Sequence, residues 1–129
     1  MPRFVLRDVA RRTDLIAASR LNSASDLYLK TENLQVTGSF KVRGAYYKIS
    51  QLTAEERAKG VIACSAGNHA QGVALAATSM GIKSVVCMPD ARRLMKVGKA
   101  PNAGARVELV KGTYDDAHDR AVELQKETA

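Results

Sequence analysis

The sequence has 129 residues, of which 46% are apolar, and it carries a formal net charge of +7. This length is typical of a single domain, and the apolar share is normal for a protein with a packed core. Because no apolar run approaches the roughly 20 residues of a membrane-spanning helix and the N-terminus lacks the apolar stretch of a secretion signal, we expect a cytoplasmic protein with no membrane partner.

The first predicted elements are a strand and two helices. In DLYLKTE, two leucines alternate with Tyr28 and Lys30, which is typical of a strand. The segment FKVRGAYYKISQL (residues 40–52) has the pattern of an amphipathic helix. After it, Thr53 and Glu56 in TAEERAKG form the capping-box pattern that begins another helix.

Three short apolar runs follow at nearly even spacing: VIAC from Val61, SVVCM from Ser84 and RVELV from Arg106. Each has the length and composition of a buried strand. Between the first two lies the alanine-rich NHAQGVALAATSMG, which predicts a helix that ends at Gly81. Alternating strands and helices predict an α/β fold in which helices cover both faces of a mostly parallel sheet, a three-layer αβα arrangement.

The segments after the second and third runs differ in helix character. ARRLMKVGKAPNAGA contains Pro101, which would cost about 3 kcal/mol inside a helix, so we expect that helix to stop near Lys99. GTYDDAHDRAVELQKE predicts a well-formed helix, with Asp116 and Arg120 spaced to pair outside its apolar stripe. That stripe consists of Tyr114, Ala117, Ala121 and Leu124.

Two further features, the basic runs and the cysteines, are each compatible with a binding site. Basic residues gather in RFVLRDVARR and ARRLMKVGKA, and a basic face is the usual footprint of a nucleic-acid-binding protein. Aromatic residues make up only 5% of the chain and no nucleic-acid motif occurs, so we expect no nucleic-acid partner. Cys64 and Cys87 lack the close spacing of a metal or redox pair. We interpret them as small apolar side chains, although the sequence permits a disulfide, and we expect no metal site.

Two glycine-containing turns at helix starts hold the residues best suited to chemistry. The turn VTGSF precedes Lys41, which is either a solvent-exposed helix lysine or a nucleophile. The turn CSAGNHAQG opens the alanine-rich helix, whose unpaired N-terminal amides and dipole favour a carboxylate or phosphate. Gly67 would let the backbone approach such a ligand closely. Asn68 has two interpretations at this point, as a ligand-binding side chain or as the N-cap of the helix.

Taken together, the two turns carry a family resemblance. LKTENLQVTGSFKVRGA followed by GVIACSAGNHAQGVALAA resembles the pyridoxal-phosphate enzymes of fold type II (tryptophan synthase beta-like), and most closely the catabolic threonine dehydratases, or threonine ammonia-lyases. The resemblance runs from about Asp8 to the C-terminus and is strongest from Leu29 to Met88. It implies a fold type II architecture, a pyridoxal 5'-phosphate cofactor, a small amino-acid substrate and a homo-oligomeric full-length enzyme.

Matched residue by residue, the resemblance assigns roles in both turns. It makes Lys41 the lysine that holds the cofactor as a Schiff base, Phe40 a residue packed against the cofactor ring, and Asn68 a donor to the phenolic oxygen of that ring. A loop that binds the substrate carboxylate is also implied, and it agrees with the anion-binding character of that helix start. This loop would consist of Ser65, Gly67, Asn68 and His69.

The reaction implied by the resemblance is the deamination of L-threonine and L-serine by β-elimination, which yields a 2-keto acid and ammonia. Such chemistry needs a neutral lysine amine, and a desolvated or positively charged setting favours that form. Relatives that racemise serine typically carry a serine before the loop glycine, where this chain has Ala66. A methyl group exchanges no proton, so the resemblance favours elimination over the alternative, a serine or threonine racemase.

Members of this family are substantially longer, and by resemblance their C-terminal half supplies a glycine-rich loop for the cofactor phosphate. No tetraglycine run occurs in this sequence. We therefore expect an N-terminal fragment: residues 1–52 begin the large domain and carry the cofactor lysine, residues 53–129 form most of the small αβ domain, and the C-terminal catalytic half is absent. Such a chain would have little activity alone. The other interpretation is a non-catalytic fragment that acts as an interaction module.

Overall fold

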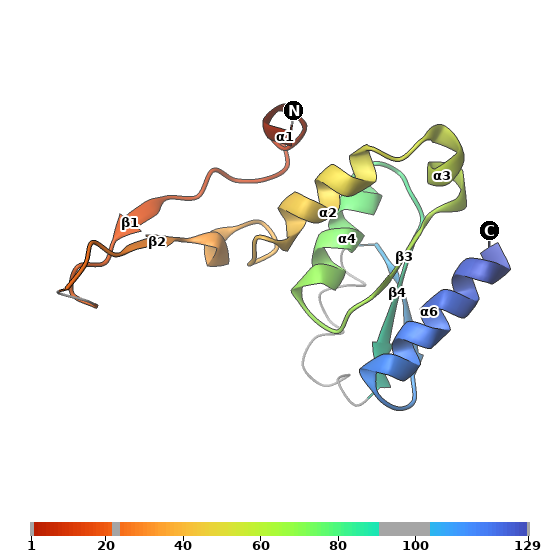
Figure 1. The fold of residues 1–129 in the computed structure, drawn as a ribbon. Coiled ribbons are helices and arrows are strands. Elements are labelled where there is room, and N and C mark those ends of the chain that lie inside the picture. Colours follow the sequence, from red (N-terminus) through yellow and green to blue (C-terminus); the bar gives the residue numbers. More distant parts are fainter. Residues whose placement is uncertain (1, 22–23, 91–103, 129) are drawn as a thin grey trace.

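A computed structural model describes residues 2–21, 24–90 and 104–128 of the chain (Figure 1). The N-terminal part contains α1 (Pro2–Val5), β1 (Leu15–Ala17), β2 (Tyr28–Lys30) and the 3-10 helix η1 (Glu32–Leu34). The remainder contains α2 (Lys41–Ser50), α3 (Ala54–Lys59), β3 (Val61–Cys64), α4 (Asn68–Ser79), β4 (Ser84–Pro89), β5 (Arg106–Val110) and α6 (Tyr114–Thr128).

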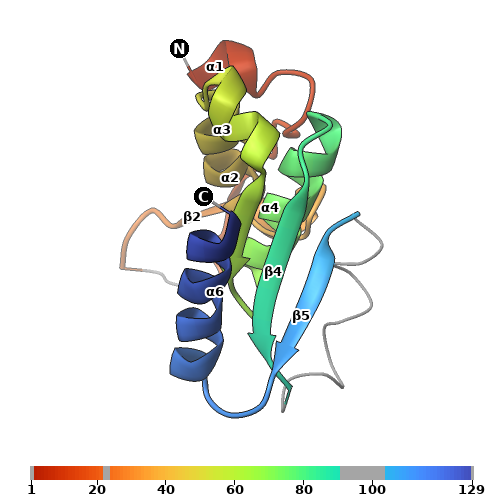
Figure 2. The ribbon, with the colours of Figure 1, turned by 90° about the vertical axis from the view of Figure 1, so that its right-hand side faces the viewer.

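The three apolar runs form one parallel sheet in the order β3-β4-β5, as the sequence predicts (Figure 2). In register, Val61 lies opposite Ser84, and Val85 lies opposite Arg106. The alanine-rich segment forms α4 between the first two strands. The predicted βαβ unit is therefore confirmed, whereas the helix expected to stop near Lys99 lies outside the described residues.

Side chains of the sheet alternate between two apolar layers. Val61 and Ala63 of β3 pack against the cluster that α2 and α4 bury, whereas Ile62 and Cys64 pack against the cluster around Leu124 of α6. This period of two is what an extended strand covered on both faces requires. The α/β prediction of a parallel sheet between helices is confirmed, with α2 and α4 on one face and α6 on the other (Figure 2).

The predicted strand in DLYLKTE forms β2, but it does not join the parallel sheet. It pairs antiparallel with β1 as a two-stranded arm, the β1–β2 arm, which extends away from the rest of the described fold (Figure 1). Tyr28, Leu29 and Lys30 are all exposed, so alternation along β2 separates no buried face from a solvent face. The expected division into domains at residue 52 stays a prediction; α2, which precedes it, shares a core with α4.

The helix ends follow local rules that the sequence makes visible. The predicted capping box is present at α3, where the Thr53 side chain accepts from Glu56 N–H and the Glu56 carboxylate accepts from Thr53 N–H. Met80 is the C-cap of α4, and Gly81 follows it with φ of +68°. The N–H groups of Gly81 and Ile82 donate to the last turn of α4, which makes a Schellman motif that only glycine enters without strain.

The expected pairing of Asp116 with Arg120 in α6 is wrong. Asp116 instead accepts hydrogen bonds from the backbone N–H and the hydroxyl of Thr113, at 2.6 and 2.8 Å. A carboxylate in the first turn satisfies backbone donors that the helix itself leaves unpaired, and this competes with a side-chain pair farther along the helix. Arg120 forms ion pairs with Glu108, Glu123 and Glu127.

The two cysteines agree with their interpretation as small apolar side chains. Both Cys64 and Cys87 are free, and Cys87 is fully buried between β4 and α6. None of the helices among the described residues is long and apolar enough to cross a bilayer.

Candidate active site at two helix starts

Lys41 is the first residue of α2, held there by a compact turn. Gly38 takes φ of +71°, a conformation that favours glycine, and its N–H donates to the Gln35 carbonyl at 2.8 Å. The Ser39 hydroxyl accepts from the Lys41 N–H at 3.3 Å. Val42, which follows Lys41, is fully buried. The backbone at Lys41 is therefore anchored, while its side chain is exposed and lies with its Nζ 5.1 Å from the centre of the Phe40 ring.

A partly buried polar network fixes this turn from the N-terminal side. The Glu32 carboxylate accepts from Arg43 Nε and Nη2 at 2.9 and 2.8 Å and from the Thr13 hydroxyl at 2.6 Å. Gln35 is 4% exposed and bonds both backbone groups of Arg11, accepting from its N–H and donating to its carbonyl. These bonds tie α2 to η1 and to the segment before β1, so they orient the start of α2.

Hydrogen bonds within this network shift the pKa values of Glu32 and Arg43. The bidentate hydrogen bonds from Arg43 lower the pKa of Glu32 to about 2, against its ordinary value of 4.5, and the hydrogen bonds from Thr13 and Gln35 add to that effect although burial opposes it. The same pair raises the pKa of Arg43. Glu32 is therefore ionised across the physiological range and holds Arg43 two residues after Lys41.

The second turn lies at the carboxyl end of β3. The Ser65 N–H continues the ladder by donating to the Cys87 carbonyl at 3.1 Å, and the Ser65 hydroxyl accepts from the Gly67 N–H at 3.2 Å. Gly67 is the N-cap of α4 and Asn68 is its first helical residue. Asn68 is therefore not the N-cap, which removes the capping interpretation. Asn68 and His69 are both exposed at this helix start.

Glycine at position 72 brings the two turns together. A Cβ built on Gly72 of α4 would lie 3.1 Å from the backbone carbon and oxygen of Lys41, closer than ordinary van der Waals contact. Only a glycine lets the backbones of α4 and α2 approach this closely. Asn68 lies one helical turn before Gly72, so it belongs to the same face of α4 as this contact. The structure therefore places the Lys41 backbone and the face of Asn68 next to each other.

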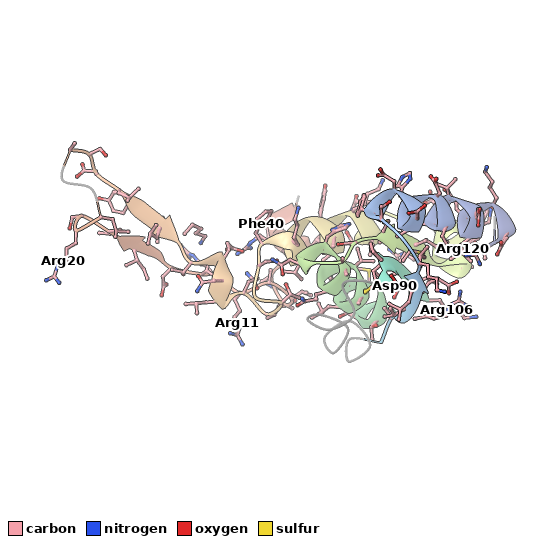
Figure 3. The ribbon with its side chains drawn as sticks, turned by 90° about the horizontal axis from the view of Figure 1, so that it is seen from below. Arg11, Arg20, Phe40, Asp90, Arg106 and Arg120 are labelled. Carbon is pink, nitrogen blue, oxygen red and sulfur yellow. The ribbon has the colours of Figure 1, made fainter. Side chains whose placement is uncertain are left out.

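The pKa of His69 also depends on Lys41. Desolvation lowers the pKa of His69, and the positive charge of Lys41 lowers it further. A neutral imidazole is thus favoured beside the lysine. Lys41 Nζ lies over the Phe40 ring, its charge acts on His69, and Ser65 is hydrogen-bonded to Gly67. Phe40 is 58% exposed where the β1–β2 arm meets the rest of the fold (Figure 3), so its ring is open to a ligand.

The donor set fits a cofactor that carries an aldehyde and several anionic oxygens. Lys41 supplies a primary amine, and α2 and α4 both begin at this place with no acidic residue in their first turns. Two helix N-termini together present a positive field to carboxylate, phenolate or phosphate groups. The close approach at Gly72 brings the backbone of Lys41 next to α4.

Sequence reasoning missed the residues that position Lys41. Glu32, Gln35, Arg43 and Gly72 all lie inside the motifs that carried the resemblance, but their roles depend on partners distant in sequence. A helix glycine in an alanine-rich segment was the available signal for Gly72, because glycine inside a helix costs about 1 kcal/mol relative to alanine and calls for a packing reason.

The comparison with known protein families settles what kind of chain this is. The family model described as pyridoxal-phosphate dependent enzyme matches residues 6–129. The chain belongs to this family. The predicted family and fold are thereby confirmed, and the structure adds that the family's two motifs meet at the starts of α2 and α4.

One curated relative and two solved structures show how similar the chain is to individual proteins. An L-threonine ammonia-lyase from Thermotoga maritima is 50% identical over 125 residues, which cover 95% of this chain and 31% of that protein. The processed form of threonine deaminase isoform 2 from Solanum lycopersicum superposes with a TM-score of 0.88 at 39% identity, covering 95% of this chain and 34% of the other. Maize serine racemase superposes with a TM-score of 0.88 at 29% identity, covering 98% of this chain and 40% of the other. The chain spans about a third of the length of the curated relative it matches.

Proposed function

We propose that this chain serves the deamination of L-threonine, and of L-serine, to a 2-keto acid and ammonia, with pyridoxal 5'-phosphate as cofactor. The observation that supports the proposal is the close approach of α4, at Gly72, to the backbone of Lys41 at the start of α2, one helical turn from Asn68. The 50% identity to a protein named L-threonine ammonia-lyase supports the choice of substrate.

The proposal gives a role to each of the residues Phe40, Lys41 and Asn68. Lys41 would hold the cofactor through Nζ and would also be the base that takes the proton from the substrate Cα. Phe40 packs against the cofactor ring, and the Asn68 side chain donates to the ring's phenolic oxygen. Pyridoxal phosphate, when bound, supplies an electron sink for the charge that develops at Cα.

The substrate carboxylate is proposed to bind at the start of α4. Ser65, Gly67, Asn68 and His69 form this loop at the carboxyl end of β3, where ligands of open α/β sheets commonly bind. The lowered pKa of His69 keeps its ring neutral, so His69 contributes its backbone N–H and packing rather than a charge. Because Gly67 has no side chain, a carboxylate can approach the backbone amides that follow it.

Racemisation is the second candidate function, favoured by the superposition on maize serine racemase. It would need a proton donor on the face of the substrate opposite Lys41. The structure turns Ala66 toward the cluster of Ala70, Val86 and Met88, where its methyl group packs against apolar side chains. Because that methyl group carries no exchangeable proton, we propose elimination as the reaction.

The same proposal includes a cellular location, a metabolic role and a domain arrangement. We place the protein in the cytoplasm, in amino-acid catabolism, and note that the keto acid made from threonine also serves isoleucine biosynthesis. Residues 1–52 are proposed to begin the large domain, with residues 53–129 in the small domain, and the full-length enzyme is proposed to be a homo-oligomer. Turnover by these 129 residues alone is expected to be slow, because the matched segment makes up only 31% of the length of the Thermotoga maritima relative.

The test measures both reactions in one sample. The chain is incubated at high concentration with pyridoxal phosphate and L-threonine or L-serine, and ammonia, keto acid and the D-amino acid are quantified. We expect ammonia and keto acid in equal amounts, lost in Lys41→Ala and retained in Lys48→Ala, which removes an exposed lysine from the same helix. A D-amino acid yield above that of ammonia would assign the chain to racemisation instead.

A further inference from the structure

Cys64 and Cys87 lie side by side in the sheet, although the whole of α4 separates them in the sequence. In the register of the parallel strands β3 and β4, each is the direct partner of the other. Both side chains belong to the apolar layer between the sheet and α6, so they point to the same face. Their spacing in sequence predicts no metal site, but the sheet supplies the proximity of two thiols that the sequence spacing lacks.

Contacts with α6 show where the two sulfurs lie. The Cys64 thiol donates to the Tyr114 carbonyl at 3.8 Å, beneath the first turn of α6. Cys87 belongs to the same buried cluster as Ala117, one turn further along α6, and both are fully buried. Neither cysteine forms a disulfide. Two free thiols therefore share one apolar layer beneath the beginning of one helix.

The spacing of neighbouring strands suits a bridging atom better than a direct bond between the sulfurs. Strands in a sheet lie about 4.7–4.9 Å apart, whereas a disulfide requires Cβ atoms about 3.5–4.5 Å apart. A metal ion bonded to two thiolates at about 2.3 Å each, the length of a zinc–sulfur bond, separates the sulfurs by up to about 4.6 Å. This span lets both side chains stand upright on the sheet, as strand side chains normally do.

The available ligands define the class of ion. Zinc is normally held by four ligands, and among residues 2–21, 24–90 and 104–128 no group of three or more His, Cys, Asp or Glu side chains could hold a metal ion. Thiolates are soft ligands that select soft ions such as Cu(I), for which two thiolates suffice. The side chains packed around the pair include Ile62, Val85 and Ala121, an apolar setting that suits a soft ion rather than a hard one.

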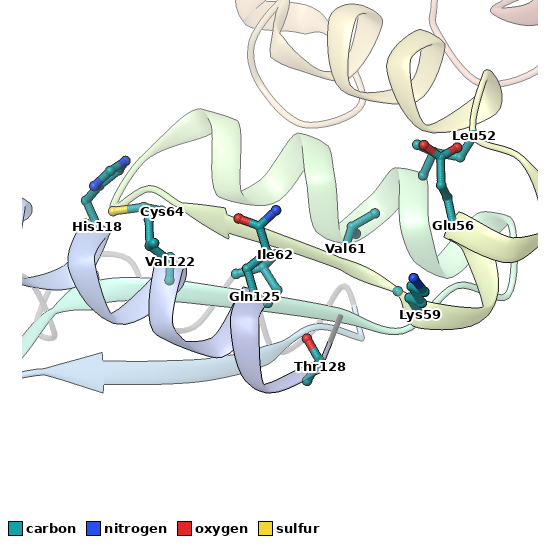
Figure 4. Close-up of a pocket in the computed structure, with 12 residues that line it drawn as sticks. Leu52, Glu56, Lys59, Val61, Ile62, Cys64, His118, Val122, Gln125 and Thr128 are labelled. Carbon is teal, nitrogen blue, oxygen red and sulfur yellow. The ribbon is translucent and has the colours of Figure 1, made fainter.

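A groove gives a route from solvent to the pair. It has a volume of about 520 Å³ and lies between β3, α3 and α6 (Figure 4). Cys64 is half-buried and lines this groove, as do His118 and Val122 of α6, whereas Cys87 is fully buried. An incoming ion therefore meets the sulfur of Cys64 first and that of Cys87 second.

We propose that Cys64 and Cys87 form a two-coordinate binding site for Cu(I). Each thiol releases its proton and each sulfur donates an electron pair to the ion, so one Cu(I) replaces two protons and copper is neither oxidised nor reduced. The site thereby gains a single negative charge, which the charges of Arg106 and Arg120 favour and that of Glu108 opposes. Because the pair lies on the face of the sheet opposite α2 and α4, the inference does not depend on the proposed reaction.

The test titrates the 129-residue chain, in the absence of oxygen, into the coloured complex of Cu(I) with bicinchoninate, a chelator that competes for the ion. We expect the protein to withdraw one Cu(I) per chain, with no change in oligomeric state by native mass spectrometry. X-ray absorption at the copper edge should show two sulfur ligands.

Single substitutions locate the ion. Cys64→Ser and Cys87→Ser should each weaken Cu(I) binding by about a hundredfold or more, since changes beside a metal ligand already cost up to about a hundredfold. Circular dichroism shows whether each variant is folded, and if the fully buried Cys87→Ser unfolds, the half-buried Cys64→Ser still tests the site.

Two controls remove other ligands nearby. Met88→Leu removes a sulfur from the opposite face of β4, and His118→Ala removes an imidazole from the groove. Both should leave the affinity for Cu(I) unchanged. The proposal is overturned if the protein withdraws no Cu(I) from the chelator, if Cys64→Ser binds as tightly as the wild type, if His118→Ala weakens binding as much as Cys64→Ser does, or if the ion joins two chains.

Discussion

Lys41 is positioned by residues that never need to touch a substrate. Glu32 and Arg43 orient the turn before it, and Gly72 lets α4 approach its backbone. The lysine itself is exposed and pairs loosely with the Phe40 ring. The geometry of the proposed site therefore depends on these supporting residues. Substituting them tests that geometry without altering the reacting groups.

Gly72 is the most sensitive of these supports. In Gly72→Ala the new methyl group would meet the backbone of Lys41 at 3.1 Å, and backbone atoms cannot rotate away as a flexible side chain can. We expect the free energy of unfolding to fall by about 1–3 kcal/mol, the usual cost of overpacking. Urea denaturation followed by circular dichroism measures this difference.

Gly44→Ala is the matched control on the partner helix. Apart from the adjoining residues and the backbone of its own helix, no atom of the described residues lies within 4 Å of a Cβ built on Gly44, so the same substitution meets no obstacle there. Alanine is favoured over glycine inside a helix by roughly 0.5–1 kcal/mol, and we expect stabilisation of that size. Equal effects of the two substitutions would contradict the close approach of α2 and α4.

The Glu32–Arg43 pair predicts a pH dependence of stability. The pKa of Glu32 is about 2 in the folded protein and 4.5 ordinarily, so its ionised form stabilises the fold fully above about pH 4.5. That contribution is lost as the pH falls from about 4.5 toward about 2. We expect Glu32→Gln to cost about 1–3 kcal/mol at neutral pH and progressively less on acidification.

Thermal unfolding of wild type and Glu32→Gln at a series of pH values measures this convergence. Glu55→Gln, at an exposed ion pair with Lys59, serves as the control and should change stability little at any pH. A difference between wild type and Glu32→Gln that stays constant down to about pH 2.5 would contradict the role assigned to the ionised carboxylate.

The helices and strands show how far local sequence determines the fold. β3, β4 and β5 could be predicted because each is a short apolar run between turn signals, and α3 because Thr53 and Glu56 form a capping box. The separate β1–β2 arm could not be predicted, since the pattern of β2 resembles that of a half-buried strand while all its side chains are exposed. Its antiparallel partner is not indicated by any local pattern.

The candidate site, too, could be predicted only in part. Lys41 and the loop at Asn68 could be predicted because their motifs are contiguous in sequence. The support from Glu32 to Arg43 and the contact of Gly72 with Lys41 depend on pairs brought together only by the fold. For Asn68, the structure removes one of the two interpretations that local rules left open, because the N-cap is Gly67, and its role in ligand binding stays a prediction.

Substitution of Gly81, which follows the C-cap of α4, should have the opposite effect on stability to substitution of Gly44. Its φ of +68° is in the left-handed region, although no atom of the described residues lies within 4 Å of an added Cβ. Gly81→Ala should therefore cost about 1 kcal/mol through backbone strain alone. Urea denaturation of the variant measures it, and an increase in stability like that expected for Gly44→Ala would contradict the Schellman ending of α4.

The three-layer arrangement makes Cys87 a probe of the whole fold. Cys87 is fully buried between β4 and α6, and burial, followed by the charge of Glu108, raises the pKa of its thiol. In a Cys64→Ala background we expect Cys87 to react with a thiol reagent about a thousandfold or more slowly than in the unfolded chain, given a typical domain stability. Labelling in urea should follow the unfolding seen by circular dichroism, and rapid labelling of the native protein would contradict a closed α6 layer.

The central claim is that the two turns make one cofactor site with Lys41 as its reactive amine. The direct measurement adds pyridoxal phosphate at about equimolar amounts, reduces the sample with borohydride and locates the pyridoxyl group by peptide mass spectrometry. We predict that it lies on Lys41 in the wild type and in Lys48→Ala, and that it falls to background in Lys41→Ala and is reduced in Gly72→Ala. A label spread over exposed lysines such as Lys48 and Lys59, unchanged by loss of Lys41, would contradict the account.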